Sequence, residues 1–217
     1  MANEVDEKLS AMMAGTGIIP HGVKMSEITQ DELLEMIFGR HQNIISPFTY
    51  KTKTTLSGIE KYLFVNANST GRFQLFLDIV DELYDYPKVF WHGLARAYTC
   101  SDNLYEYNES IKELFQEDLP YKEYLMDKTE RKWLAELQSK PKLTIYRAMT
   151  IDEAQDGDYG VSWTTKKSVA NFFAKKYIRN LATNGMEKVV VKLVIDTSAI
   201  HAVFMGRNEY EIIYIND

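Results

Sequence analysis

The stretch "PKLTIYRAMT", residues 141–150, decides the fold class, because the character of the chain changes at its first residue. The residues after Pro141 are mostly apolar or β-branched, which is typical of a β-strand. Amphipathic helical patterns dominate the chain before this stretch, and strand patterns dominate after it. Since helices come first and strands later, with no alternation of strands and helices, the sequence predicts an α+β fold.

The region before residue 141 is predicted to be mainly helical. Residues 1–25 are read as a loose arm, because "GTGIIPHG" would interrupt a helix there. Thr29 followed by Glu32 is a capping-box pattern that starts the first predicted helix. The predicted organisation is therefore an arm at 1–25, a helical region at 26–140 and a β core at 141–217. Apolar spacing predicts further helices at residues 71–86, 88–98, 108–116 and 127–137.

The β core is predicted from short apolar runs that are separated by turn residues. Residues 151–160, "IDEAQDGDYG", are rich in turn-forming residues. Helical spacing at 164–178, with a cap at Thr164 or Thr165, predicts one helix whose apolar face includes Phe172 and Phe173. The strands are expected at residues 142–150, 161–163, 188–196, 199–205 and 209–215.

Composition limits the compartment and the class of partner. The chain has 217 residues and a formal net charge of −6, which disfavours nucleic acid as a partner because phosphate binding needs a basic patch. The single cysteine, Cys100, cannot form an internal disulfide, which favours a reducing compartment. No apolar run approaches the ~18 residues of a membrane span. We therefore expect a soluble, cytoplasmic protein with no membrane partner. The histidines show no metal-ligand spacing, so we expect no metal.

Three segments of the β core carry polar groups that a buried strand does not need. Arg147 lies within "TIYRAM", and a guanidinium there must point at a carboxylate or a bound anion, because an unpaired buried charge is costly. Ser162 and Thr164 lie two residues apart and would share one face of a strand. Glu209 and Glu211 would also share a face, which costs energy unless a cation lies beside them or one stays protonated.

Each of these features also has an ordinary structural interpretation. Arg147 could form a structural ion pair within the sheet, and the two hydroxyls could be strand side chains and a helix cap. The two glutamates could lie at a solvent-exposed strand end. Trp91 and Trp133 are expected to pack helices together.

The three segments follow one another as Tyr146–Arg147, Ser162–Trp163–Thr164 and Glu209–Tyr210–Glu211. This combination resembles the arginine–serine–glutamate class of mono-ADP-ribosyltransferases, which includes bacterial toxins and phage-encoded enzymes. In that family an arginine lies on the first core strand, a Ser-x-Ser/Thr strand precedes a helix, and a Glu-x-Glu or Gln-x-Glu step opens a late strand. The resemblance covers residues 142–217. It departs from the family at Trp163, where threonine is common, and at Ala148, where many relatives have glycine.

The resemblance implies a split β-sheet core, NAD⁺ as substrate, and transfer of ADP-ribose to an acceptor protein with release of nicotinamide. Glu211 would bond the ribose and stabilise the developing cation, Ser162 would orient Glu211, and Arg147 would bind the phosphates or the adjacent ribose. Glu209 would position the acceptor, which a carboxylate at this place favours as an arginine. Further NAD⁺ contacts are predicted at Tyr146, Ser162, Trp163, Thr164 and Phe173, although Phe172 and Phe173 also fit a core interpretation.

The resemblance also assigns roles to two loops, and two other functions remain as alternatives. In the family, a loop that corresponds to residues 177–188 folds over the nicotinamide. The turn "FMGRN", residues 204–208, would face the target protein with Phe204 and Arg207 exposed. An NAD⁺ glycohydrolase, in which water replaces the acceptor, and a non-catalytic module that binds NAD or ADP-ribose are the alternatives to transfer.

Overall fold

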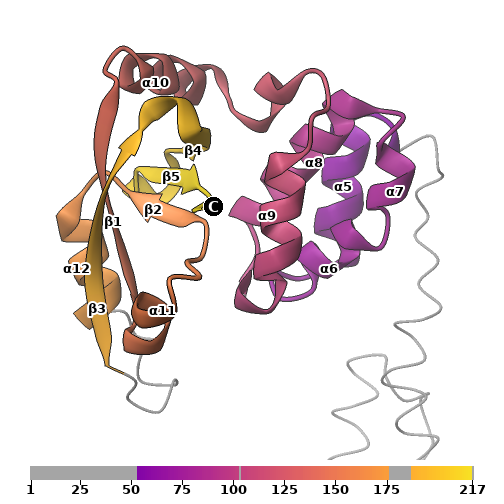
Figure 1. Ribbon diagram of the computed structural model, residues 1–217. Coiled ribbons are helices and arrows are strands. Elements are labelled where there is room, and N and C mark those ends of the chain that lie inside the picture. Colours follow the sequence, from indigo (N-terminus) through magenta and orange to yellow (C-terminus); the bar gives the residue numbers. More distant parts are fainter. Residues whose placement is uncertain (1–52, 103, 176–186, 217) are drawn as a thin grey trace, which may run out of the picture. The chain divides into compact units, whose positions relative to one another are not determined.

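The computed structural model describes residues 53–102, 104–175 and 187–216, and its fold is α+β, as predicted (Figure 1). The chain divides after Thr49, and every described element belongs to the part from Tyr50 to Asp217. Helices come first, and a five-stranded sheet follows. The predicted arm at 1–25 and the predicted helix that starts at Thr29 lie outside the described residues.

The described helices before the sheet follow the apolar spacing of the sequence. The helices predicted at 88–98, 108–116 and 127–137 are confirmed as α8, α9 and α10. The cap of α10 is Asp127, which forms a capping box with Glu130. The elements are α5 (Leu56–Asn66), α6 (Arg72–Leu77), α7 (Val80–Leu83), α8 (Pro87–Thr99), α9 (Asn108–Gln116) and α10 (Lys128–Gln138), with short 3₁₀ helices η3 (Leu104–Tyr107) and η4 (Lys122–Leu125).

Two features of this region differ from the prediction. The single helix expected at 71–86 is two short helices, α6 and α7, because the backbone of Ile79 leaves the helical region at φ −122° and ψ 0°. Phe76, Ile79 and Leu83 are buried on both sides of the break. Helix α5 was not predicted separately, although Thr55 caps it by accepting a hydrogen bond from the Gly58 N–H.

Helix α8 is the centre of the helical core. Its residues Phe90, Trp91 and Leu94 are fully buried. Gly93 allows close approach of the neighbouring helices, since a Cβ at this position would lie 3.0 Å from side-chain carbons of both Ile59 and Phe76. Pro87 occupies the first turn of α8, where its missing N–H is not needed.

The sheet has the strand order β3-β1-β2-β5-β4, and every pairing among its strands is antiparallel. All five strands lie where the sequence predicts them, with ends that differ by a few residues. The longest pairing joins β1 to β3 along nine residues of each strand. The strands are β1 (Lys142–Thr150), β2 (Ser162–Thr164), β3 (Lys188–Asp196), β4 (Ile200–Phe204) and β5 (Glu211–Tyr214).

Two helices lie between the strands. The segment predicted as turns begins with a short helix, α11 (Ile151–Asp156), which Thr150 caps and Gly157 ends at φ 77°. The predicted helix at 164–178 is α12 (Lys167–Lys175), and residues 176–178 lie outside the described chain. The helix begins at Lys167, so the predicted cap at Thr164 or Thr165 is wrong; Thr164 Oγ1 instead accepts a hydrogen bond from the Lys166 N–H in the turn that precedes the helix.

The helical region and the sheet meet through aromatic side chains. Phe204 of β4 lies 5.7 Å from Tyr98 of α8 and 6.4 Å from Phe115 of α9, measured between ring centroids. All three rings are buried. Figure 1 shows α8 and α9 beside the part of the sheet that contains β2 and β5. The predicted exposure of Phe204 is therefore wrong, because its ring fills this junction. The side chain of Arg207 lies outside the described set.

Among the described residues, none of the helices combines the length and apolar character needed to cross a membrane.

Candidate active site

A pocket of about 190 Å³ lies among β1, β2, α12 and the turn before β5. Residues from five separate segments of the chain line it, including Lys188 at the start of β3. Every residue that the sequence predicted for the site borders this pocket, namely Tyr146, Arg147, Ser162, Trp163, Thr164, Phe173, Glu209 and Glu211. The sheet register explains part of this convergence, because Thr164 pairs with Tyr146 on one side and with Glu211 on the other.

Glu211 is held by two hydroxyl groups. Ser162 Oγ donates a hydrogen bond to Glu211 Oε1 at 2.5 Å, and Tyr98 Oη donates to the same oxygen at 2.7 Å. Hydrogen bonds to a carboxylate are stronger than those between neutral groups, so they fix the carboxylate in place. The predicted contact between Ser162 and Glu211 is present.

Tyr98 was missed by the sequence interpretation. It lies on α8, 113 residues before Glu211. Because it belongs to the apolar face of that helix, the sequence pattern indicates only a core residue. Burial raises the pKa of Tyr98 well above its usual range, and the neighbouring Glu211 carboxylate raises it further. The hydroxyl therefore stays protonated and acts as a donor. A single sequence carries no signal for this pairing.

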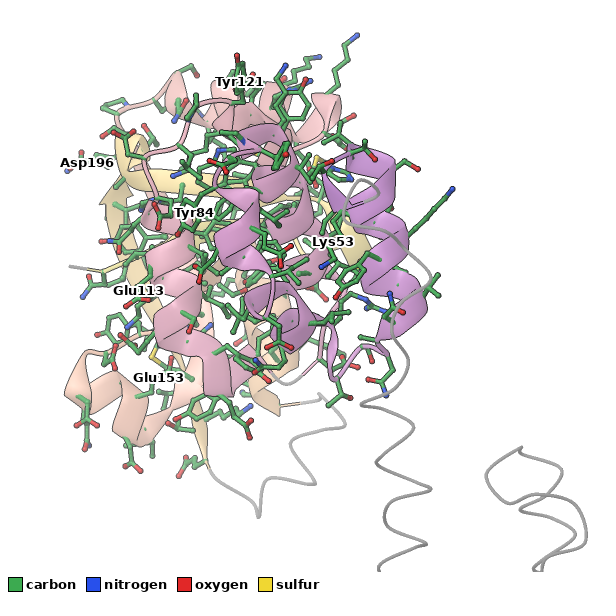
Figure 2. All side chains as sticks on the ribbon, turned by 90° about the vertical axis from the view of Figure 1, so that its right-hand side faces the viewer. Lys53, Tyr84, Glu113, Tyr121, Glu153 and Asp196 are labelled. Atoms are coloured by element: carbon green, nitrogen blue, oxygen red, sulfur yellow. The ribbon has the colours of Figure 1, made fainter. Side chains whose placement is uncertain are left out.

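The Arg147 guanidinium points at a carboxylate, as one of the two predicted options required. Its Nε and Nη2 lie 3.0 and 2.9 Å from Glu153 Oε1, and its Nη1 donates to the Ser162 carbonyl oxygen at 2.8 Å. Figure 2, which views the molecule from the side of helices α5 to α9, labels Glu153 on α11. Gly160 leaves room for this arrangement, because a Cβ there would lie 2.8 Å from Arg147 Cζ. The predicted contact of Arg147 with phosphate stays a prediction.

Glu209 and Glu211 do not share a strand face, contrary to the sequence argument. Strand β5 begins at Glu211, and Tyr210 has a left-handed backbone with φ 51°. Glu209 therefore lies in a turn, where the two-residue alternation of a strand does not apply. Thr164 Oγ1 holds this turn by donating to the Glu209 carbonyl oxygen at 2.7 Å. Both glutamates still border the pocket.

Cationic groups line the same pocket as the two carboxylates. Arg147 and Lys188 border it together with Glu209 and Glu211, so positive charge lies near the acidic pair. Just outside, Lys166 Nζ lies 3.1 Å from the centroid of the Tyr210 ring. The pocket that both glutamates border therefore also contains cationic side chains of the protein.

The aromatic residues near the pocket have different environments. The Trp163 ring is buried between Tyr159 and Tyr214, with ring centroids 5.7 and 6.2 Å away, so the ring belongs to the core. Phe173 borders the pocket, whereas Phe172 is 47% exposed and the core interpretation of that residue is wrong. Trp133 of α10 packs edge-on against Tyr210 rather than between helices.

Comparisons with family models, with curated proteins and with solved structures find no match for this chain. Within the part of the chain that the structure describes, no three His, Cys, Asp or Glu side chains form a group that could hold a metal ion.

Proposed function

We propose that the pocket binds NAD⁺ and that the protein is a mono-ADP-ribosyltransferase, which passes ADP-ribose to an arginine of an acceptor protein. The observation that carries this proposal is the convergence of Arg147, Ser162 and Glu211 on one pocket, with Ser162 bonded to Glu211 inside it. These groups come from three strands of an antiparallel sheet, which is compatible with the split-sheet core of that family.

The first chemical step breaks the bond between C1′ of the ribose and the nicotinamide nitrogen, and nicotinamide leaves with the bonding electron pair. Positive charge develops at C1′, so a carboxylate beside it lowers the barrier. Glu211 takes this role. Ser162 and Tyr98 both hold its Oε1, which also fixes the direction of the other carboxylate oxygen.

The second step forms a bond between C1′ and a guanidinium nitrogen of the acceptor, and the nitrogen loses a proton to Glu209. Glu209 lies in the turn that Thr164 holds at the pocket edge. The amine of Lys166 lies over the ring of the neighbouring Tyr210, so this ring accepts a cation. Since guanidinium groups stack on aromatic rings, this contact supports the turn as a place for the acceptor arginine.

Arg147 would bind the diphosphate without leaving Glu153. A guanidinium has five N–H donors, and its contacts to Glu153 and the Ser162 carbonyl use one on each nitrogen. The volume of about 190 Å³ is smaller than the ~300–1,000 Å³ of pockets that enclose a drug-sized ligand. The pocket would therefore enclose the nicotinamide ribose end and leave the adenosine end outside.

The test is transfer of label from NAD⁺ that carries the label in its ADP-ribose part, with agmatine as an arginine analogue and a bacterial lysate as a source of acceptors. Wild-type protein and the control Glu136→Gln, whose carboxylate is exposed on α10, should both label agmatine. Glu211→Gln should lower labelling at least about 100-fold. Glu209→Ala should lose transfer and keep some hydrolysis to free ADP-ribose.

Two results would redirect the proposal. Hydrolysis of NAD⁺ by wild type with no labelled acceptor would make the protein a glycohydrolase. Binding of NAD⁺ or ADP-ribose with no release of nicotinamide would make it a binding module.

A further inference from the structure

The contact between Tyr98 and Glu211 joins the helical region to the candidate catalytic carboxylate. Tyr98 Oη and Ser162 Oγ donate to the same carboxylate oxygen, at 2.7 and 2.5 Å. Ser162 belongs to a strand next to Glu211 in the sheet, whereas Tyr98 reaches it from α8. The site therefore contains residues of the helical region as well as residues of the sheet.

The Tyr98 ring is fixed by its surroundings, so its hydroxyl has a defined position. The ring packs edge-on against Phe115, with centroids 5.3 Å apart, and lies tilted against Phe204, with centroids 5.7 Å apart. Tyr98 is 6% exposed, and Phe204 pairs with Glu211 in the β4–β5 register. The same aromatic cluster therefore supports both the donor and the strand that carries the acceptor. A group held in this way can orient a catalytic side chain.

We propose that Tyr98 is a positioning residue for Glu211, so that helix α8 completes the active site of the β core. This inference rests on the proposed function for its kinetic consequence, but the contact itself can be tested without any activity. A purely structural role would make the hydroxyl no more than a buried polar group that has found an acceptor. The two roles differ in what the loss of the hydroxyl does to Glu211.

The variant Tyr98→Phe removes the hydroxyl and keeps the ring between Phe115 and Phe204. The matched control is Tyr62→Phe, which removes the hydroxyl of another buried tyrosine, on α5 and outside the pocket. Loss of a hydrogen bond to the charged group should lower kcat for nicotinamide release about 10- to 100-fold, with KM for NAD⁺ within about twofold. Tyr62→Phe should leave both constants unchanged.

The second readout is a carboxyl titration by ¹³C NMR, with the Glu211 signal assigned by its absence in Glu211→Gln. A donor that stabilises the ionised carboxylate is lost in Tyr98→Phe, so the titration midpoint should move to higher pH by about one unit. Arg147, Lys188 and Glu209, which also border the pocket, are unchanged in this variant and in Tyr62→Phe.

These readouts separate the two proposals. If wild type releases no nicotinamide, the proposed function fails, and the titration still decides whether Tyr98 holds Glu211. An unchanged midpoint in Tyr98→Phe would overturn the positioning role. A moved midpoint with unchanged kcat in an active enzyme would overturn it as well, because the contact would then be structural.

Discussion

Replacing Gly160 by alanine tests whether the Arg147 guanidinium lies where its contacts place it. A Cβ at residue 160 would lie 2.8 Å from Arg147 Cζ, so the guanidinium would have to move. Arg147 and Glu153 are only 19% and 15% exposed, and the Gly160 N–H also donates to Glu153 Oε1 at 3.0 Å. The substitution therefore disturbs all three groups together.

The expected cost follows from two opposing contributions. Overpacking of a filled site costs about 1–3 kcal/mol. The reduced freedom of the unfolded chain on replacing glycine by alanine offsets about 0.4–1 kcal/mol of this. We expect the free energy of unfolding to fall by about 1.3 kcal/mol, which in a protein of this size lowers Tm by about 3–5 °C.

Urea denaturation and thermal melting, followed by circular dichroism, measure this cost. The control is Gly71→Ala, because a Cβ at residue 71 meets its nearest atom only at 3.8 Å. In an Arg147→Ala background, Gly160→Ala should cost little, since the guanidinium is gone. Equal stability of Gly160→Ala and Gly71→Ala, or an undiminished cost in the Arg147→Ala background, would contradict the close approach of residue 160 to the guanidinium.

Three further predictions concern the pocket and the pH dependence of stability. Ser162→Ala removes one of the two donors to Glu211 Oε1 and should lower kcat for nicotinamide release about tenfold; a change in KM alone would argue against its orienting role. Tyr210→Leu removes the ring beside Glu209 and should raise KM for agmatine several-fold, while NAD⁺ hydrolysis stays unchanged; equal loss of both would exclude a role in acceptor binding. Burial lowers the pKa of His92 on α8 from its usual value of 6.5, so the folded protein favours the neutral ring. The free energy of unfolding should therefore fall as pH drops below about 6.5, and urea midpoints at pH 5.5 and 7.5 should differ less in His92→Gln than in wild type; the same difference in both would contradict this assignment.

The sequence predicted the fold class and most elements, because hydrophobic periodicity is a local property. The run from Lys188 to Asp196 and the apolar spacing of α8, α9 and α10 need no tertiary information to be recognised. The break between α6 and α7 could not be predicted in this way, because Phe76, Ile79 and Leu83 keep helical spacing across it and the apolar pattern carries no sign of it.

The sequence predicted those residues of the candidate site that belong to the three motif segments. Arg147, Ser162 and Glu211 border one pocket, but the partners that hold two of them were missed. Glu153 lies in a segment whose turn-forming composition hid the short helix α11. Tyr98 lies 113 residues from Glu211, on a helix whose pattern reads only as core. The turn at Glu209 and Tyr210 was mistaken for strand, because the positive φ of Tyr210 is rare for a residue other than glycine.

The decisive measurement for NAD⁺ cleavage at this pocket is the release of nicotinamide from NAD⁺ by the purified protein, followed over time without any added acceptor. We expect steady release by wild type and by Glu136→Gln, and a rate at least about 100-fold lower for Glu211→Gln. Absence of release by wild type, or release by folded Glu211→Gln at the wild-type rate, would contradict the assignment of this pocket to NAD⁺ cleavage.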